Sequence, residues 1–361
     1  MDYSIWAWLG FGAFILLMLS LDLGIFSRKA HTPTYREASA WSAVWVSLAL
    51  TFSGIIYFFP QFLGIAPDLA GIKFKEFLTG YLIELSLSVD NLFVFLLIFS
   101  YFKVPSRFQH RVLFWGVLGA LVMRITMIFL GTALIVRFHW IIYVFGAFLV
   151  YTGIKMFSQE ETHIEPEQNP IVRAVTRFIP IDRHYDGEKF FTVRDGRRTG
   201  TLLLLVLVIV EVTDLVFAVD SIPAIFGITT DSFIIYTSNV FAILGLRSLY
   251  FLLAGVVEKF HFLKLGLATV LTFIGVKMLL PGLEGALALA GAGEAIDPKY
   301  LHIPIEASLI FVATVLVASV VLSLLFPKKA ETEVDIDLPS DFGAPDFDEE
   351  DALSSRPGRN T

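Results

Sequence analysis

The chain contains the stretch Leu202-Leu-Leu-Leu-Val-Leu-Val-Ile-Val-Glu211-Val-Thr-Asp214-Leu-Val-Phe-Ala-Val-Asp220-Ser221. It is apolar and long enough to cross a lipid bilayer, which takes about 20 residues of helix. A second apolar stretch holds a matching motif, Glu84-Leu-Ser-Leu-Ser-Val-Asp90-Asn91. In both motifs two acids stand six residues apart, and a neutral oxygen-bearing side chain follows the second. A carboxylate at membrane depth is costly unless it is paired, hydrated or bound to a cation. Two copies at matching places therefore indicate a site.

The composition is that of a membrane protein. Hydrophobic residues make up 56% of the chain and charged residues 17%, whereas soluble chains carry about 25% charged residues. The chain has no cysteine, which excludes disulfides, thiolate metal ligands and thiol catalysis. Ten of its acids lie after residue 330, in a stretch with three prolines. This composition predicts a disordered acidic cytoplasmic tail over residues 330–361.

Hydropathy predicts an all-α polytopic membrane protein with about nine transmembrane helices. The first two predicted helices lie within residues 1–60, and the ninth lies at residues 304–326. The long loop 158–199 is a predicted cytoplasmic cover that contains a short hairpin, with its turn at Asp195-Gly196. The predicted spans cover residues 5–26, 41–60, 76–100, 111–136, 140–157, 201–225, 232–256, 263–280 and 304–326.

Basic residues fix the predicted orientation. Lys and Arg are concentrated in the loops after the odd-numbered spans, and this alternation does not break along the chain. By the positive-inside rule, those loops face the cytoplasm. We therefore expect a multi-pass protein of the plasma (inner) membrane, with its N-terminus outside and its C-terminus in the cytoplasm. The first span has basic residues after it and none before it, which is the order of a membrane anchor rather than of a secretory signal.

The acidic motifs belong to an internal repeat. Gly119-Ala-Leu-Val-Met-Arg124 resembles Ala242-Ile-Leu-Gly-Leu-Arg247, and Tyr151-Thr-Gly-Ile-Lys155-Met156 resembles Phe273-Ile-Gly-Val-Lys277-Met278. Spans 3–5 (residues 76–157) therefore match spans 6–8 (residues 201–280) in order. Because each copy has three spans, the second enters the membrane from the opposite face. Such a 3+3 inverted repeat is typical of secondary transporters, which bind their cargo at the repeat interface; the alternative is a repeat kept only as a packing scaffold.

Acids six residues apart lie about 240° apart around a helix. Glu84 and Asp90, like Asp214 and Asp220, should either face different neighbours or flank a break in the helix. Pro223 would favour a break in the second motif because it removes a backbone hydrogen bond; in the first motif a break is expected by symmetry alone.

Charge counting favours a mobile cation. Six intramembrane acids stand against at most three bases, so a purely structural ion-pair network would not balance. Histidines fall in loops or at span edges, and an all-oxygen set suits Mn²⁺, Mg²⁺ or Ca²⁺. For the neutral side chains Asn91 and Ser221, hydrogen bonding between helices is an equal alternative to binding of a metal ion. The predicted metal site is Glu84, Asp90, Asn91, Asp214, Asp220 and Ser221; the proton-coupling or gating acids are Asp22 and Glu211; the charge-balancing bases are Arg124, Arg247 and Lys277. For Asp22, a role as a simple interfacial acid is an equal alternative. For Arg124 and Arg247, snorkelling to the membrane surface is the alternative to the favoured pairing with the acids.

Other chemistry is weakly represented. The sequence has no Gly-x-x-x-x-Gly-Lys-Ser/Thr loop, no Gly-x-Ser-x-Gly and no His-Glu-x-x-His. We therefore expect neither enzymatic activity nor a bound cofactor, and no nucleic-acid partner. The expected partners are the lipid bilayer and a divalent cation.

The motifs around Glu84–Asn91 and Glu211–Ala224 resemble the TerC family of integral membrane proteins, and within it the Alx-like branch. The resemblance covers roughly residues 1–326 and extends to Leu21-Asp22-Leu and Thr237-Ser-Asn239. It implies manganese export and homeostasis, a response to alkaline pH and, by the family's name, tellurium resistance. Alx-type proteins are also labelled redox modulators, but a chain without cysteine supplies no thiol for that chemistry.

Two hypotheses follow from these patterns. The first is a secondary transporter that exports divalent cations, most of all Mn²⁺, by alternating access to a mid-membrane carboxylate site. The alternative is a membrane scaffold or insertion partner that transports nothing, whose buried charges bind other membrane helices.

Overall fold

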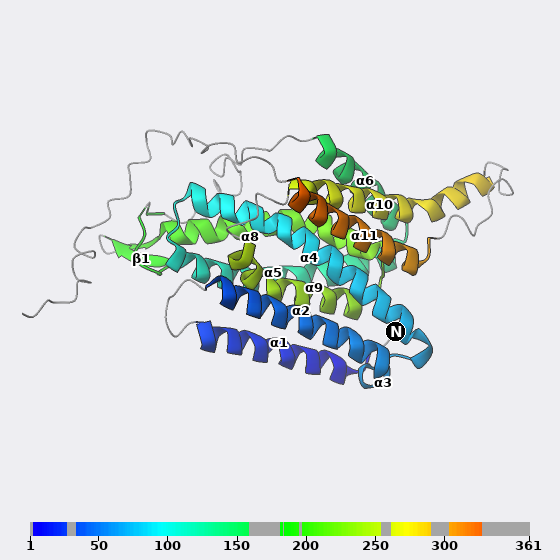
Figure 1. Ribbon diagram of the computed structural model, residues 1–361, viewed down its shortest axis with the longest axis horizontal. Helices are drawn as coiled ribbons and strands as arrows, with labels where there is room; N and C mark the ends of the chain where they lie inside the picture. Colours follow the sequence, from blue (N-terminus) through cyan, green and yellow to red (C-terminus); the bar gives the residue numbers. More distant parts are fainter. Residues whose placement is uncertain are drawn as a thin grey trace, which may run out of the picture.

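A computed structural model describes residues 3–26, 34–158, 181–182, 184–194, 197–253, 261–289 and 303–326. Within these ranges the backbone is almost entirely helical (Figure 1). The side chains of Asp22 and Asp90 lie outside the described part, as does the predicted tail. The helices are α1 (Ile5–Phe26), α2 (Tyr35–Phe58), α3 (Pro60–Leu63), η1 (Pro67–Leu69), α4 (Ala70–Tyr101), α5 (Ser106–Arg137), α6 (Ile141–Ser158), α8 (Leu202–Phe226), α9 (Ser232–Leu253), α10 (His261–Leu289) and α11 (Ile305–Leu325).

The predicted all-α membrane fold is confirmed, since each predicted span coincides with an apolar helix. In the described residues, seven helices are long and apolar enough to cross a membrane, and α1 and α6 contribute shorter apolar stretches, Ile5–Ser20 and Ile141–Phe157. How many of these helices cross the bilayer stays a prediction. Several begin earlier than predicted; α2, for example, starts at Tyr35 because Thr34 and Glu37 form a capping box there.

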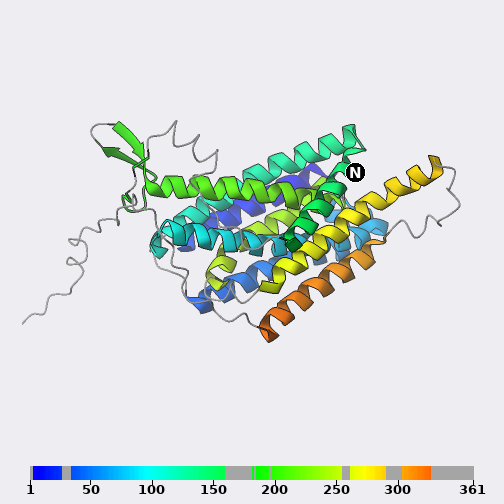
Figure 2. The same cartoon turned by 90° about the horizontal axis from the view of Figure 1, so that it is seen from above.

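Helix α9 lies at the centre of the bundle, and most of its residues are buried. It packs against α2, α4 and α5. Helices α1 and α2 lie along one side of this centre, and α6, α10 and α11 lie along the other (Figures 1 and 2). Lipid-facing apolar side chains cover the outer helices, such as Leu16 on α1 and Val317 on α11, both more than 60% exposed. This gradient from buried to exposed apolar surface is what a bilayer solvent permits.

Contacts between the two predicted triplets follow a regular pattern. Each helix of the first triplet packs against its counterpart in the second: α4 against α8, α5 against α9, and α6 against α10. The cross pairs α4–α9 and α5–α8 are also in contact. A two-fold relation between the triplets would produce these pairs, so the packing supports the inverted repeat, which remains a prediction.

The predicted breaks in the acidic helices are not present. Helix α4 is continuous from Ala70 to Tyr101, and α8 is continuous from Leu202 to Phe226 with Pro223 inside it. Pro223 lies in the last turn of α8, where the loss of one backbone hydrogen bond does not interrupt the helix. The acids of the second motif therefore face different neighbours, which was the other expectation.

The predicted hairpin in the long loop is confirmed. Strands β1 (Phe191–Arg194) and β2 (Arg197–Gly200) pair antiparallel, with Arg194 opposite Arg197. Arg111 of α5 lies over the Phe190 ring, and the hydroxyl of Tyr185 donates to the carbonyl of Phe102. The hairpin region is thus attached to the ends of α4 and α5. At the opposite end, α10 continues through Pro281 to Leu289, beyond the predicted end of its span at residue 280.

Candidate functional site

The guanidinium of Arg124 is the centre of a buried polar cluster. It lies near the middle of α5 and is 2% exposed. Its Nη1 forms an ion pair with Oε1 of Glu84 on α4, and donates to Oδ1 of Asn239 at 2.9 Å and to Oγ of Ser221 at 3.1 Å. Nη2 lies 3.8 Å from Oδ1 of Asp214 on α8. One side chain therefore joins helices from both triplets.

Arg124 contacts acids of both motifs, as is expected of a charge-balancing base. Glu84 and Asp214, which occupy matching places in the two motifs, share the same guanidinium. All the partners of this group are buried. In such a water-free setting a charge is tolerated only with compensating charge and hydrogen bonds, and the cluster supplies both.

Helix α8 carries a second carboxylate on the face of Asp214. Glu211 is three residues earlier and half-buried, and the two acids interact electrostatically. One oxygen of each, Oε2 of Glu211 and Oδ2 of Asp214, is buried with no hydrogen-bond partner among the described residues. Buried carboxylate oxygens without a donor are expensive, which makes them candidate positions for a proton or a cation.

Gly119 of α5 provides the room for Glu211. A Cβ atom at this position would lie 2.1 Å from Oε1 of Glu211, far inside van der Waals contact. The carboxylate therefore rests directly against the α5 backbone. Any side chain at residue 119 would displace it.

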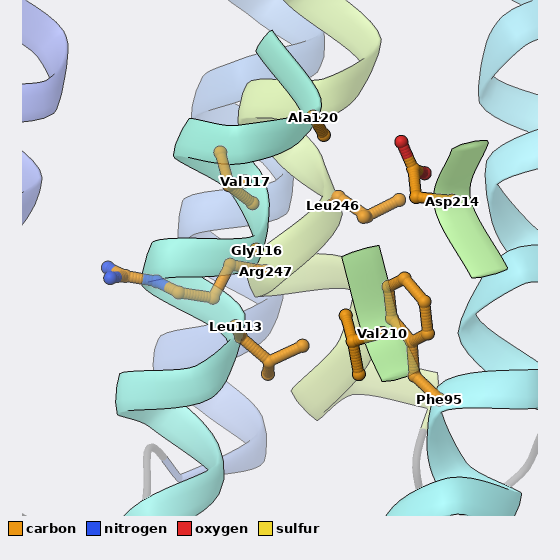
Figure 3. A pocket seen from close by; sticks show the side chains of 9 residues that line it. All are labelled: Phe95, Leu113, Gly116, Val117, Ala120, Val210, Asp214, Leu246 and Arg247. Carbon is orange, nitrogen blue, oxygen red and sulfur yellow. The ribbon is translucent and has the colours of Figure 1, made fainter. Parts of the chain in front are cut away.

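A small cavity adjoins Asp214 (Figure 3). Its volume is about 10 Å³, which is about what one water molecule needs. The close-up shows the Asp214 carboxylate at its edge, whereas the guanidinium of Arg247 points away from it. The cavity wall is mostly apolar: Phe95, Leu113, Gly116, Val117, Ala120, Val210 and Leu246 complete it.

The remaining predicted site residues are less concentrated. Asn91 is buried, Asp220 is half-buried, and Lys277 of α10 donates to Oγ of Ser308 at 2.9 Å, in the first turn of α11. Among the residues that the structure describes, no three acids or histidines lie close enough together to hold a metal ion. The predicted six-residue metal set stays a prediction, because the Asp90 side chain lies outside the described part.

Asn239 is a site residue that charge counting missed. It is 1% exposed, accepts from Arg124, and donates from Nδ2 to the carbonyl of Ile235 at 3.0 Å. A neutral amide in an apolar span gives no charge signal, although an amide in the middle of a buried helix is itself unusual.

Fold and site together define a polytopic helical membrane protein with a buried ion-pair centre shared by two groups of helices. Comparison with known proteins makes this specific. The model of the family described as "Integral membrane protein TerC family" matches residues 70–331. The chain belongs to the TerC family.

Several relatives are similar over most of their length. An uncharacterized membrane protein from Myxococcus xanthus is 50% identical over 92% of this chain and 96% of its own. Two proteins provisionally named membrane-bound redox modulator Alx, from Escherichia coli strain K12 and Photorhabdus laumondii, are 47% and 46% identical over 88% and 90% of this chain and 93% and 97% of their own. No solved structure matches the chain.

Proposed function

We propose that this protein is a secondary transporter that exports divalent cations, most of all Mn²⁺, across the plasma (inner) membrane. The observation that carries the proposal is the pairing of Glu84 and Asp214 with one arginine between them. The two acids come from corresponding helices of the two triplets. A change in how the triplets pack would therefore change the distance between the acids, which is what alternating access to a central site requires.

Arg124 would compete with the transported cation for the same two carboxylates. Its guanidinium occupies the space between two carboxylates that a divalent cation would bridge. When the cation binds, the guanidinium can keep its neutral acceptors, Asn239 and Ser221, while it releases the acids. The carboxylates would then be compensated in both arrangements, which avoids an uncompensated buried charge at any stage.

The remaining acids fit a coupling role. We assign Glu211 and Asp22 to proton coupling or gating, since Glu211 shares a face of α8 with Asp214 and interacts with it electrostatically. A proton on Glu211 would weaken the repulsion between the two acids. Asp90, Asn91, Asp220 and Ser221 remain candidate oxygen ligands, and Lys277 and Arg247 candidate counter-charges.

The alternative of a scaffold that transports nothing requires buried charges that face a partner's helices. Arg124 instead finds its acceptors on α4, α8 and α9 of the same chain. The Alx relatives' name suggests redox chemistry, but this chain has no cysteine with which to perform thiol exchange. Both considerations favour transport.

The test is Mn²⁺ flux into proteoliposomes that contain a Mn²⁺-quenched dye. The variants Asp214→Asn and Asp220→Asn keep side-chain size and remove one charge each. We expect flux to fall about tenfold or more for Asp214→Asn, the change that ~1.4 kcal/mol of lost binding produces. Asp68→Asn, on an exposed residue of η1, is the matched control. If Asp214→Asn carries Mn²⁺ as fast as the control, this site is not the transport site.

A further inference from the structure

A second buried ionic cluster lies far from Arg124, at the end of the bundle where α4 and α9 begin. The ammonium of Lys73 lies 2.8 Å from Oε2 of Glu76 and 2.8 Å from Oδ2 of Asp231. The hydroxyl of Tyr3 donates to the same Asp231 oxygen at 2.6 Å. The side chains of Lys73, Glu76 and Asp231 are 10%, 12% and 7% exposed. We call these four residues the outer cluster.

The outer cluster joins three separate parts of the chain. Lys73 and Glu76 are in the first two turns of α4, which belongs to the first triplet. Asp231 precedes α9 of the second triplet, and its Oδ1 accepts from the backbone N–H groups of Phe233 and Ile234. It therefore also caps α9, in the manner of an acidic N-cap residue. Tyr3 adds the segment before α1.

The surroundings of Tyr3 keep its hydroxyl protonated, so that it acts as a hydrogen-bond donor. Burial, together with the negative charges of Asp231 and Glu76, raises the pKa of the Tyr3 hydroxyl well above its ordinary value. The hydroxyl thus keeps its proton at any physiological pH.

Directly below the outer cluster, α4 and α9 are in close contact. A Cβ atom at Gly80 of α4 would lie 3.0 Å from Oγ of Ser238 on α9, and 2.8 Å from Cδ1 of Ile225 on α8. Ser238 is completely buried. It is the residue before Asn239, which binds Arg124. The contact between α4 and α9 therefore separates the central site from this end of the protein.

The opposite end of the bundle is closed by different chemistry. If Glu84 is aligned with Asp214 and Arg124 with Arg247, then Leu203 and Val206 correspond to Lys73 and Glu76, and Phe108 corresponds to Asp231. These three side chains are buried in a single apolar cluster. The two ends are thus equivalent in position and different in kind: ionic at the start of α4 and α9, apolar at the start of α5 and α8.

We propose that the outer cluster is the external gate of the transport path, an ionic lock between the triplets that must dissociate before the central site can open to the outside. This proposal rests on the proposed function for its purpose. Separating α4 from α9 at this end breaks the Lys73–Asp231 pair, whereas the Lys73–Glu76 pair, within α4, stays intact. Lys73 therefore keeps one carboxylate partner when the gate opens, which lowers the energy of the open state.

Thiol accessibility tests the lock without any transport measurement. The chain has no cysteine, so Ser238→Cys introduces a single, nearly isosteric reporter. A membrane-impermeant, cationic methanethiosulfonate is added to the outside of intact cells, and the labelling rate is measured. We expect slow labelling in the Ser238→Cys background, and labelling at least about tenfold faster when Asp231→Asn or Lys73→Gln is added. Asn keeps the cap on α9 and removes the charge.

Two controls separate gate opening from loss of structure. Lys75→Gln breaks the exposed Lys75–Glu306 pair at the same end of the protein and should leave the rate unchanged. The double variant Lys73→Gln/Asp231→Asn should be labelled no faster than the faster single variant, since both substitutions remove the same Lys73–Asp231 pair. A second reporter, Val206→Cys in the apolar cluster, should stay unlabelled in every background.

Three outcomes would each overturn the proposal. The first is a labelling rate at Ser238→Cys that neither Asp231→Asn nor Lys73→Gln changes. The second is a double variant that is labelled faster than either single variant, and the third is accelerated labelling of Val206→Cys. The outcome is independent of cargo. A protein that passes the labelling test but carries no Mn²⁺ refutes the transport assignment alone, and one that carries Mn²⁺ with an unchanged labelling rate refutes the gate alone.

Discussion

At the scale of single residues, one guanidinium determines the arrangement of the centre. Arg124 can bind Glu84 and approach Asp214 at once because its two terminal nitrogens form a planar fork. A lysine carries the same charge on one nitrogen and cannot span both acids. The geometry, and not only the charge, is therefore required at residue 124.

Replacement of Arg124 should destabilise the protein in a graded way. Arg124→Met leaves two buried carboxylates without a counter-charge, and breaking a buried pair in this way costs about 3–5 kcal/mol. Arg124→Lys should cost less, because the charge remains. The apparent melting temperature in detergent should fall in the order wild type, Arg124→Lys, Arg124→Met.

Glu84→Gln is the matched partner for this series. Added to Arg124→Met, it removes one of the orphaned charges and should restore part of the lost stability. If Arg124→Met melts at the wild-type temperature, the ion pair contributes nothing to stability.

The sequence predicted this centre only in part. Two acids at equal places in two repeated motifs, and one arginine in each following span, predict Glu84 and Asp214 in one site with Arg124 as a charge-balancing base, but not that one arginine contacts both acids. Asn239 and the outer cluster were missed for a physical reason. Their contacts join residues more than a hundred positions apart, as with Arg124 and Asn239 or Tyr3 and Asp231, and neutral or loop-edge residues leave no charge anomaly in the pattern.

At the scale of helices, glycines bring α6 and α10 into backbone contact. A Cβ atom at Gly275 would lie 2.6 Å from the carbonyl oxygen of Gly146, and one at Gly153 would lie 2.8 Å from that of Ala268. Gly153 and Gly275 are the glycines of the repeated motif, and Gly146 and Ala268 correspond in the same alignment. The two contacts are thus equivalent under the repeat. Small residues at membrane helix interfaces permit such close approach.

Gly275→Ala should therefore destabilise the α6–α10 pair, because the new methyl group meets backbone rather than a flexible side chain. Overpacking of this kind costs about 1–3 kcal/mol, so the apparent melting temperature in detergent should fall. Gly12→Ala on α1, where the new Cβ meets nothing within 4 Å, is the control and should not lower it. Equal melting temperatures for the two variants would show that α6 and α10 can separate without cost.

A break in the helix was one of two explanations that the sequence left open, and the continuous helices α4 and α8 exclude it. Acids at positions i and i+6 cannot share one face of a helix, so they either flank a break or face different neighbours. In α8 the first acid, Asp214, faces α5, while Asp220 is directed elsewhere on an unbroken helix. A surrounding bundle offers neighbours on every side, so divergent acids need no interruption of the backbone.

At the scale of the whole molecule, the two ends of the bundle carry opposite roles that depend on its orientation. The distribution of Lys and Arg predicts that the start of α1, α3 and the outer cluster lie outside, and that the β1–β2 hairpin lies in the cytoplasm. The 3+3 arrangement requires this opposition, since a triplet that begins outside must be matched by one that begins inside. An inverted orientation would make the ionic lock a cytoplasmic gate.

Single cysteines decide the orientation directly, because the native chain offers no thiol background. Gln61→Cys lies at an exposed position of α3, and Lys189→Cys lies just before the hairpin, where the native side chain is 67% exposed. We expect an impermeant maleimide to label Gln61→Cys in intact cells, and Lys189→Cys only after the membrane is permeabilised. The reverse pattern would invert the topology and with it the direction assigned to transport. Labelling of both sites in intact cells would mean that the hairpin and α3 share one side, which the three predicted membrane crossings between them, α4, α5 and α6, do not allow.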